Sequence, residues 1–167
     1  MRSARRKQTV SARWSEDGIE VLAPASMPEV QLQEIVQKLR QRLENRRTRR
    51  QLNDDADLRQ RAADLNRKYF KGRLKIASIE YVANQKHRFG SCTPADAHIR
   101  LSLRVGSLPD WVRDYVIVHE LAHLVEANHS DRFWRLVGAY PLTERARGYL
   151  MAVGMEADGN EPAVEGE

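Results

Sequence analysis

Cysteine is almost absent from this sequence of 167 residues, which has Cys92 and no second cysteine. One cysteine excludes an intramolecular disulfide and agrees with a reducing, cytoplasmic setting, because disulfide-built domains belong to oxidising compartments. Long apolar runs are also lacking, since none approaches the roughly 18 residues that a membrane-spanning helix needs. The basic residues at the start are followed by QTVSARWSEDG, which has no apolar segment of the kind that a secretory signal requires. We therefore expect a cytoplasmic protein with no membrane partner.

Acidic residues are distributed unevenly, and two segments almost lack them. Residues 1–13 contain five basic side chains and no acidic one, and residues 36–50 contain seven basic side chains against Glu44 alone. The last dozen residues show the reverse, with five acids and no base. Residues 1–7 are expected to form a basic arm, and most of residues 36–50 an arginine-rich helix. These two basic segments predict a contact with the phosphates of nucleic acid. The alternative is a solvated helix face with a loose arm, which is common in proteins that bind no nucleic acid.

The length and the composition predict one folded domain. Charged residues make up 31% and hydrophobic residues 41% of the chain, a balance typical of a soluble globular domain rather than of a disordered or membrane protein. A chain of this length can bury about two-thirds of the surface that its unfolded form exposes. We expect one domain over 1–154, followed by an acidic, disordered tail over 155–167.

Turn signals and helical spacing divide the first half of the chain. The turn-forming cluster SEDG separates two strand-like runs, so Gln8–Pro24 is predicted to be a β-hairpin. A helix start over Ser26–Glu29 is followed by apolar residues at helical spacing, which predicts a helix to about Arg46. A second helix is expected over Asp54–Phe70.

The second half of the chain changes its period and then returns to helical spacing. Alternating residues over 76–82 and 99–103 predict two strands, and the segment QKHRFGSCTPADA between them is expected to be a loop. A capping signature opens a helix over about Leu108–Glu126, which is apolar almost all round and must therefore be buried. A short helix after Ser130 and a last helix over Thr143–Val153 complete an α+β fold.

The stretch VHELAHLVEANHSDRFW carries three of the five histidines. His119 and His123 are four residues apart, so on a helix their rings project from the same side, about 6 Å apart along the axis. This spacing suits two ligands of one metal ion. Glu120 lies about 100° round the helix axis, where its carboxylate can reach water near the metal without binding the metal itself.

A third ligand requires the chain to turn back after this helix. On a continuous helix His129 would lie about 15 Å from His119 along the axis and could not share its ion. Asn128 tolerates a left-handed backbone, and a serine that can start a new helix follows His129, so a corner is expected here. His119, His123 and His129 would then hold one Zn²⁺ ion, with a fourth position open for water or substrate.

The alternative is that these histidines are hydrogen-bonded core residues, since H-E-x-x-H also occurs by chance. Burial of two histidines and a glutamate without an ion would be costly, because each unpaired buried polar group costs on the order of 1–3 kcal/mol. The spacing does not specify a donor for the oxyanion that develops during hydrolysis. The candidates for this role, or for substrate binding, are His87, Arg88, Tyr115 and Tyr140.

The sequence HELAH followed by NHSDRFW, with HRFGSC and IRLSLR upstream, resembles the YgjP-like zinc metallopeptidase family, whose relatives are the SprT-like and WLM proteins. The resemblance covers most of the chain. It implies a single zincin-like domain in which a small antiparallel or mixed sheet and the N-terminal hairpin pack against a buried HExxH helix and flanking helices. It also implies His119, His123 and His129 as zinc ligands and Glu120 as the general base. The family usually has tryptophan where this chain has Phe89.

The expected function is hydrolysis of peptide bonds in a peptide or protein substrate by zinc-bound water that Glu120 activates. Two alternatives stay open. One is a metal-dependent nucleotide phosphohydrolase in which arginines near the cleft hold a triphosphate, although the sequence has no Walker-type glycine loop. The other is a DNA-associated zinc protein, based on the arginine-rich helix.

Overall fold

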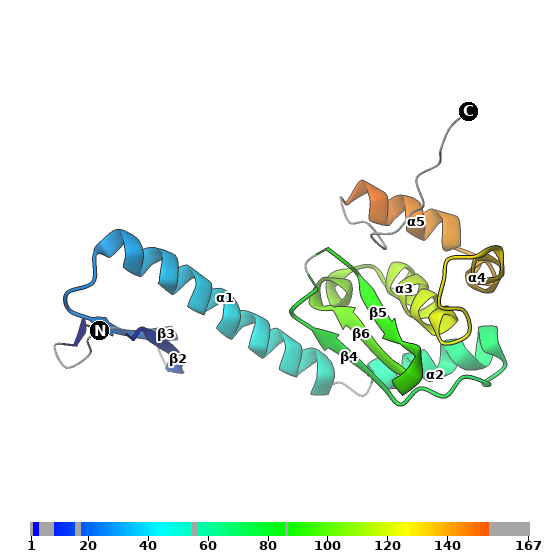
Figure 1. Cartoon of the computed structure of the whole chain (residues 1–167), viewed down its shortest axis with the longest axis horizontal. Coiled ribbons are helices and arrows are strands. Elements are labelled where there is room, and N and C mark those ends of the chain that lie inside the picture. The colour runs from blue at the N-terminus through cyan, green and yellow to red at the C-terminus, as the bar shows by residue number, and fades with distance from the viewer. Residues whose placement is uncertain (1, 4–8, 16–17, 55–56, 86, 154–167) are drawn as a thin grey trace. The chain divides into compact units, whose positions relative to one another are not determined.

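The chain divides into two compact units, Met1–Arg50 and Gln51–Glu167 (Figure 1). The computed structural model describes residues 2–3, 9–15, 18–54, 57–85 and 87–153. The acidic tail predicted over 155–167 lies outside the described residues, and so does the basic arm apart from Arg2–Ser3. The single domain over 1–154 stays a prediction.

The first unit contains the predicted hairpin, which is confirmed. β2 (Ser11–Ser15) and β3 (Gly18–Pro24) pair antiparallel, with Ser15 opposite Gly18 at the turn. Gly18 has a φ of +126°, a conformation that glycine adopts without the steric cost of a side chain. β1 (Arg2–Ser3) pairs with β3 in parallel, which gives the strand order β1-β3-β2.

α1 (Glu29–Asp54) is longer than the predicted helix, whose end near Arg46 was wrong. The apolar spacing stops at Leu43, but the arginines, glutamine and leucine that follow favour a helix without needing a buried face. Local contacts support the exposed helix. Arg40 pairs with Glu44 one turn later at 2.8 Å, and the Arg47 guanidinium lies 5.3 Å from the centroid of the Trp14 ring in β2.

A mixed three-stranded sheet forms one layer of the second unit. The strand order is β4-β6-β5, with β4 (Ser78–Val82) parallel and β5 (Gly90–Thr93) antiparallel to β6 (His98–Ser102). The predicted loop between the strands was therefore wrong in part, since it contains β5 and the 3-10 helix η1 (Pro94–Asp96). The four residues of β5 show no apolar alternation, and their strand conformation depends on pairing with β6, which sequence spacing does not reveal.

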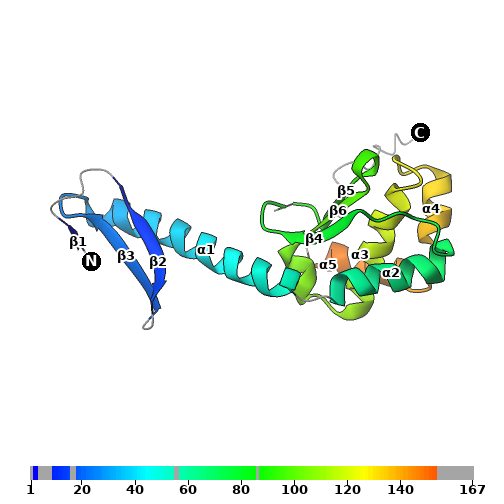
Figure 2. The same ribbon diagram turned by 90° about the horizontal axis from the view of Figure 1, so that it is seen from below.

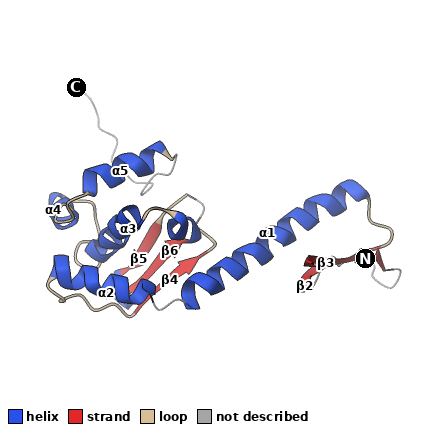
Figure 3. Ribbon diagram, turned by 180° about the vertical axis from the view of Figure 1, so that it is seen from behind, coloured by secondary structure: helices blue, strands red, loops and turns tan. Residues whose placement is uncertain are grey.

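Two helices cover one face of this sheet, and two further helices pack on one of them. α2 (Asp57–Phe70) and α3 (Asp110–His123) lie on the same face of the sheet (Figures 2 and 3), and α4 (Asp131–Val137) and α5 (Thr143–Ala152) both contact α3. The 3-10 helix η2 (Leu103–Ser107) leads from β6 towards α3. Between positions 112 and 122 every residue of α3 except one arginine is buried. The prediction of a buried helix is confirmed.

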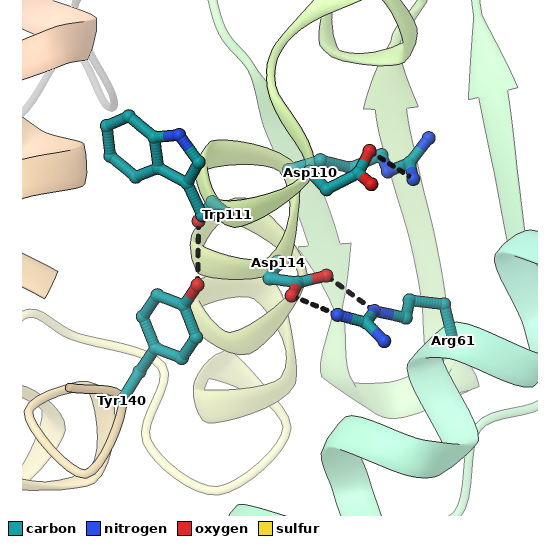
Figure 4. Close-up of polar contacts among 6 residues, drawn as sticks. Arg61, Asp110, Trp111, Asp114 and Tyr140 are labelled. Atoms are coloured by element: carbon teal, nitrogen blue, oxygen red, sulfur yellow. Dashed lines mark hydrogen bonds and ion pairs between the residues drawn. The ribbon is translucent and has the colours of Figure 1, made fainter. Parts of the chain in front are cut away.

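An ion pair joins α2 to α3 inside this unit (Figure 4). Both carboxylate oxygens of Asp114, a buried residue, accept hydrogen bonds from the Arg61 guanidinium, and the bond from Nε is 2.7 Å long. These hydrogen bonds raise the pKa of Arg61 above its ordinary value, so the guanidinium stays charged. Because a bidentate arginine–carboxylate contact restricts both position and angle, the pair holds α3 in register with α2.

The predicted capping signature at the start of α3 is wrong. The N-cap residue is Pro109, which makes no side-chain cap, and the hydroxyl of Ser107 instead donates to the carbonyl of Arg104 at 2.8 Å. Asp110 pairs with Arg113 one turn later, at 2.9 Å. Tertiary burial, rather than capping, therefore stabilises the start of this helix.

The fold class predicted from the sequence, α+β with a small mixed sheet and flanking helices, is confirmed. Packing of the N-terminal hairpin against the HExxH helix stays a prediction. None of the described helices has a stretch both long and apolar enough to cross a membrane.

Candidate metal centre

The last turns of α3 carry the H-E-x-x-H residues. His119 and Glu120 are buried, with exposed fractions of 4% and 1%, and His123 one turn later is half-buried. The ring centroids of the two histidines are 5.0 Å apart, as their spacing on one helix face requires. The surrounding apolar residues of α3 are fully buried, and each contributes roughly 1.5–3 kcal/mol to the stability of the segment. The two rings are therefore presented from a rigid element.

α3 ends at His123, and a turn brings the chain back towards it. The N–H groups of residues 124–126 donate to the carbonyls of Leu121 and Ala122, which closes the helix. Ser130 then donates its N–H to Asn128 at 2.8 Å, and its hydroxyl accepts from the backbone N–H of Phe133 at 3.4 Å, as an N-cap for α4. His129 lies within this turn.

The turn brings three imidazole rings together. Nε2 of His129 lies 3.2 Å from Nε2 of His119, and ring nitrogens of His119, His123 and His129 all lie within 4.8 Å of one another. In a tetrahedral zinc site with Zn–N bonds of about 2.0–2.1 Å, neighbouring nitrogens are about 3.3 Å apart. The His119–His129 separation matches this geometry, and together the three rings are placed so that they could hold a metal ion.

Hydrogen bonding orients one of these rings for coordination. Nδ1 of His123 lies 3.1 Å from the carbonyl oxygen of Glu126, to which it can donate its proton. This contact leaves Nε2 of His123 as the nitrogen with a lone pair for a metal. Histidine ligands in metal sites commonly donate their second N–H to a carbonyl in this way, which fixes the tautomer and the ring plane.

Gly90, at the start of β5, approaches Glu120 more closely than any larger residue could. A Cβ atom added at Gly90 would lie 2.3 Å from Oε1, 2.7 Å from Cδ and 2.8 Å from Cγ of Glu120. Such distances are far inside van der Waals contact, so the backbone of β5 forms the wall against which this carboxylate packs. The sequence alone does not identify Glu120 as the group that packs against Gly90.

Gln85, from the segment that follows β4, and Ser102, from β6, hold the segment that contains Gly90. Gln85 donates from Nε2 to the hydroxyl of Ser91 at 2.6 Å, and the hydroxyl of Ser102 donates to the Gln85 carbonyl at 3.0 Å. Ser102 also donates its backbone N–H to the carbonyl of Phe89, whose side chain is buried. Gln85 and Ser102 therefore support the wall beside Glu120, a role that sequence reasoning missed because it depends on strand pairing.

Cys92 lies two residues further along β5 and is half-buried. Burial, with a smaller contribution from the charge of Glu120, raises the pKa of its thiol to about 12. The thiol is therefore protonated at neutral pH. Because the thiolate is the form that ligates metals and attacks electrophiles, this cysteine packs as a small apolar residue.

The four candidates for substrate or oxyanion contact lie in different surroundings. His87 and Arg88 are exposed in the segment before β5. Tyr115 is buried one turn before His119, with ring centroids 6.0 Å apart. The hydroxyl of Tyr140 donates to the carbonyl of Trp111 at 2.8 Å (Figure 4), about 12 Å from His119 along the axis of α3. Tyr115 thus lies beside the three-histidine cluster, whereas Tyr140 is hydrogen-bonded at the opposite end of α3.

Two aromatic residues contact the histidines and were not predicted to do so. Phe133 and Trp134 follow the turn and lie on α4. Phe133 lies 4.8, 4.5 and 4.6 Å, between ring centroids, from His119, His123 and His129. These contacts could have been predicted from the sequence, because Ser130 caps a helix next to His129 and both aromatic residues lie in the first turn of that helix.

Comparison with known proteins identifies the family of this chain. The family described as "YgjP-like, metallopeptidase domain" matches residues 58–151. The crystal structure of the metallopeptidase zymogen of Pyrococcus abyssi abylysin is similar at 23% identity and a TM-score of 0.49, over 61% of this chain and 97% of that one. No curated protein matches the chain significantly. The matched range includes α2 to α5 and the three histidines.

Proposed function

The chain belongs to the YgjP-like metallopeptidase family, and from this membership we propose that it hydrolyses peptide bonds at one zinc ion held by His119, His123 and His129. The observation that carries this assignment is the convergence of three ring nitrogens within 4.8 Å, beside a buried glutamate. Three neutral imidazoles and an open fourth position are the donor set of catalytic zinc. The protein would act in the cytoplasm.

Glu120 is proposed as the general base. Its carboxylate extends from the helix that presents two of the histidines and packs against Gly90, so its position is defined by both α3 and β5. When bound, zinc supplies Lewis acidity, which polarises the carbonyl under attack and makes water easier to deprotonate. Glu120 takes a proton from the attacking water and passes it to the amine that leaves, so the carboxylate ends the cycle ionised as it began.

β5 offers a place for the substrate. Among the described strands β5 pairs only with β6, and it is one of the two edge strands of the order β4-β6-β5. An extended peptide can pair with the backbone of such an edge. Because Gly90 of β5 touches Glu120, a peptide bound along this edge would pass next to the proposed base. This arrangement favours a peptide over a nucleotide substrate. For the oxyanion, Arg88 and His87 before β5 and Tyr115 beside His119 stay proposals.

Loss of the third ligand tests the metal site. We expect His129→Ala to weaken zinc binding at least about tenfold, since even groups that merely support a ligand contribute this much. Zinc content of the purified chain and its dissociation constant, measured by competition with a chromophoric chelator, give the result. His98→Ala is the matched control, because His98 is half-buried on β6 and pairs with Glu80 at 3.2 Å, outside the three-histidine cluster.

Wild-type zinc binding that is retained in His129→Ala would remove His129 from the site. Casein and nucleoside triphosphates, offered to the wild-type chain with and without chelator, separate a peptidase from a nucleotide phosphohydrolase. Chelator-sensitive release of peptides without release of phosphate is the expected result.

A nucleic-acid partner is a separate proposal, supported by one face of α1. Lys38, Arg42, Arg46 and Arg49 are three or four residues apart, so they lie on one side of the helix, and all four are exposed. If these four side chains contact phosphates, a fourfold rise in salt concentration should weaken binding to duplex DNA roughly 100-fold. Fluorescence anisotropy with a labelled duplex measures this, with the chain in which all four are glutamine as the control. An affinity for DNA that does not change with salt concentration, or that is the same in the glutamine control, contradicts the proposal.

A further inference from the structure

The third histidine differs from the other two in the element that carries it. His119 and His123 project from a buried helix, whereas His129 lies in the turn between α3 and α4. A turn restrains a side chain less than the middle of a packed helix does. Rotation of the His129 ring about its bond to Cβ would move Nε2 away from the point that the other two rings share. A contact that holds the plane of this ring would therefore influence the whole site.

Trp134 makes that contact. Its indole stacks on the His129 imidazole with ring centroids 5.5 Å apart and an interplanar angle of 25°. The arrangement towards His119 is different, since that ring meets the indole edge-on at 6.2 Å and 67°. Phe133, the preceding residue, lies near all three histidines and so does not distinguish them. Stacking on one ligand is thus specific to Trp134.

The indole is itself held from α5. The guanidinium carbon of Arg147 lies 4.7 Å from the centroid of the Trp134 ring, within the range of a cation–π contact. Arg147 also bonds to the carboxylate of Glu144 one turn earlier, at 3.2 Å. A chain of contacts therefore leads from α5 through α4 to the turn that carries His129.

We propose that Trp134, supported by Arg147, is a positioning residue that fixes the plane of the His129 ring and thereby sets the affinity of the site for zinc. This inference rests on the proposed function, because it requires that the three histidines bind zinc. Neither side chain is proposed to contact the reacting atoms. Substitution of Trp134 or Arg147 is therefore expected to lower the affinity for zinc, and to lower turnover only because less zinc is bound.

Trp111 is a matched control within the same chain. It lies on the first turn of α3, and the guanidinium carbon of Arg145, also from α5, lies 4.8 Å from its ring centroid. Its aromatic neighbour is Tyr149, edge-on at 5.5 Å. Trp111 thus shares with Trp134 the residue type, the partial burial and an arginine from the same helix, but its ring packs on a tyrosine at the far end of α3.

The test measures the zinc dissociation constant of the full chain by chelator competition. Trp134→Leu is expected to weaken binding about 10- to 100-fold, the range for groups that orient a metal ligand. Trp134→Phe keeps a flat ring and should bind within a few-fold of wild type. Trp111→Leu should match wild type, although both leucine variants are expected to lower Tm. Arg147→Met, which leaves the indole in place, should weaken zinc binding several-fold, whereas Arg145→Met should not.

Two further measurements separate positioning from general damage to the fold. In a His129→Ala background, Trp134→Leu should have no additional effect on zinc affinity, because its action passes through the missing ring. Addition of zinc should change the tryptophan fluorescence of Trp111→Phe but not that of Trp134→Phe.

Wild-type zinc affinity in both Trp134→Leu and Arg147→Met would overturn the inference, and so would equal weakening in Trp111→Leu. If Trp134→Leu does not fold, the arginine variants provide the test. Weaker zinc binding in Arg147→Met than in Arg145→Met supports the inference, and equal zinc binding in the two overturns it. Failure of the wild-type chain and of Trp111→Leu to bind zinc would instead reject the three-histidine site itself, and this inference with it.

Discussion

Replacement of Glu120 with glutamine should reduce kcat for peptide hydrolysis by about 10²- to 10⁴-fold, the contribution that a positioned general base makes. Glutamine has nearly the shape of glutamate, so it can occupy the same buried position against Gly90 without creating a cavity. It cannot take a proton from water. Because the proposed zinc ligands are histidines, the variant should still bind one zinc ion per chain.

Peptide release, zinc content and Tm should be measured together for this variant. Glu126→Gln is the control, since Glu126 follows α3 closely, and its role towards His123 is played by the backbone carbonyl rather than by the side chain. The control should hydrolyse peptide at a rate near that of wild type. Undiminished hydrolysis in Glu120→Gln would reject the carboxylate as the base, whereas loss of zinc from this variant would show that Glu120 supports the metal.

Replacement of Gly90 with alanine is expected to have the second-largest effect. The added methyl group would lie 2.3 Å from Oε1 and 2.8 Å from Cγ of Glu120, so either the carboxylate or β5 must move. Displacement of a catalytic group by about 1 Å can lower the rate about 100-fold. Overpacking of a filled interior also lowers the free energy of unfolding by about 1–3 kcal/mol. Denaturant unfolding and peptide-hydrolysis rates measure the two effects.

Gly148→Ala is the matched control for this substitution. Gly148 lies in α5, and a Cβ atom added there meets nothing within 4 Å. Alanine favours a helix over glycine by about 1 kcal/mol, so this variant should be slightly more stable than wild type and equally active. Removal of the carboxyl group in the double variant Gly90→Ala/Glu120→Ala should relieve the clash, so the destabilisation by Gly90→Ala should shrink in that background. Equal destabilisation in both backgrounds would place the clash elsewhere.

Local patterns were sufficient for the elements whose period is set by near neighbours. The helix that became α3 was predicted from its apolar run, because the residues that share a helix face are three or four positions apart in the sequence. The hairpin over β2 and β3 followed from turn residues for the same reason. The family was likewise indicated by short motifs around His119, and the match over 58–151 confirms it.

Patterns failed where the structure depends on partners distant in the sequence. Residues 90–93 were assigned to a loop because their segment contains glycine, proline and aspartate, yet pairing with β6 makes them a strand. The end of α1 was placed too early because its exposed residues 46–51 form a helix without an apolar face. The strand β5 depends on hydrogen bonds to β6, a partner outside its own segment. This exposed part of α1 is solvated, so no apolar pattern marks where the helix ends.

The sequence alone determined the chemistry that this protein can offer: three imidazoles for a metal and one carboxylate between two of them, since these depend on residue type and on helical spacing. Tertiary structure alone decided where that chemistry is held. The turn after His123 returns His129 to within 3.2 Å of His119, β5 brings Gly90 against Glu120, and α4 stacks Trp134 on His129. Each of these contacts joins different structural elements, and packing between elements, unlike the spacing within one, depends on the whole fold.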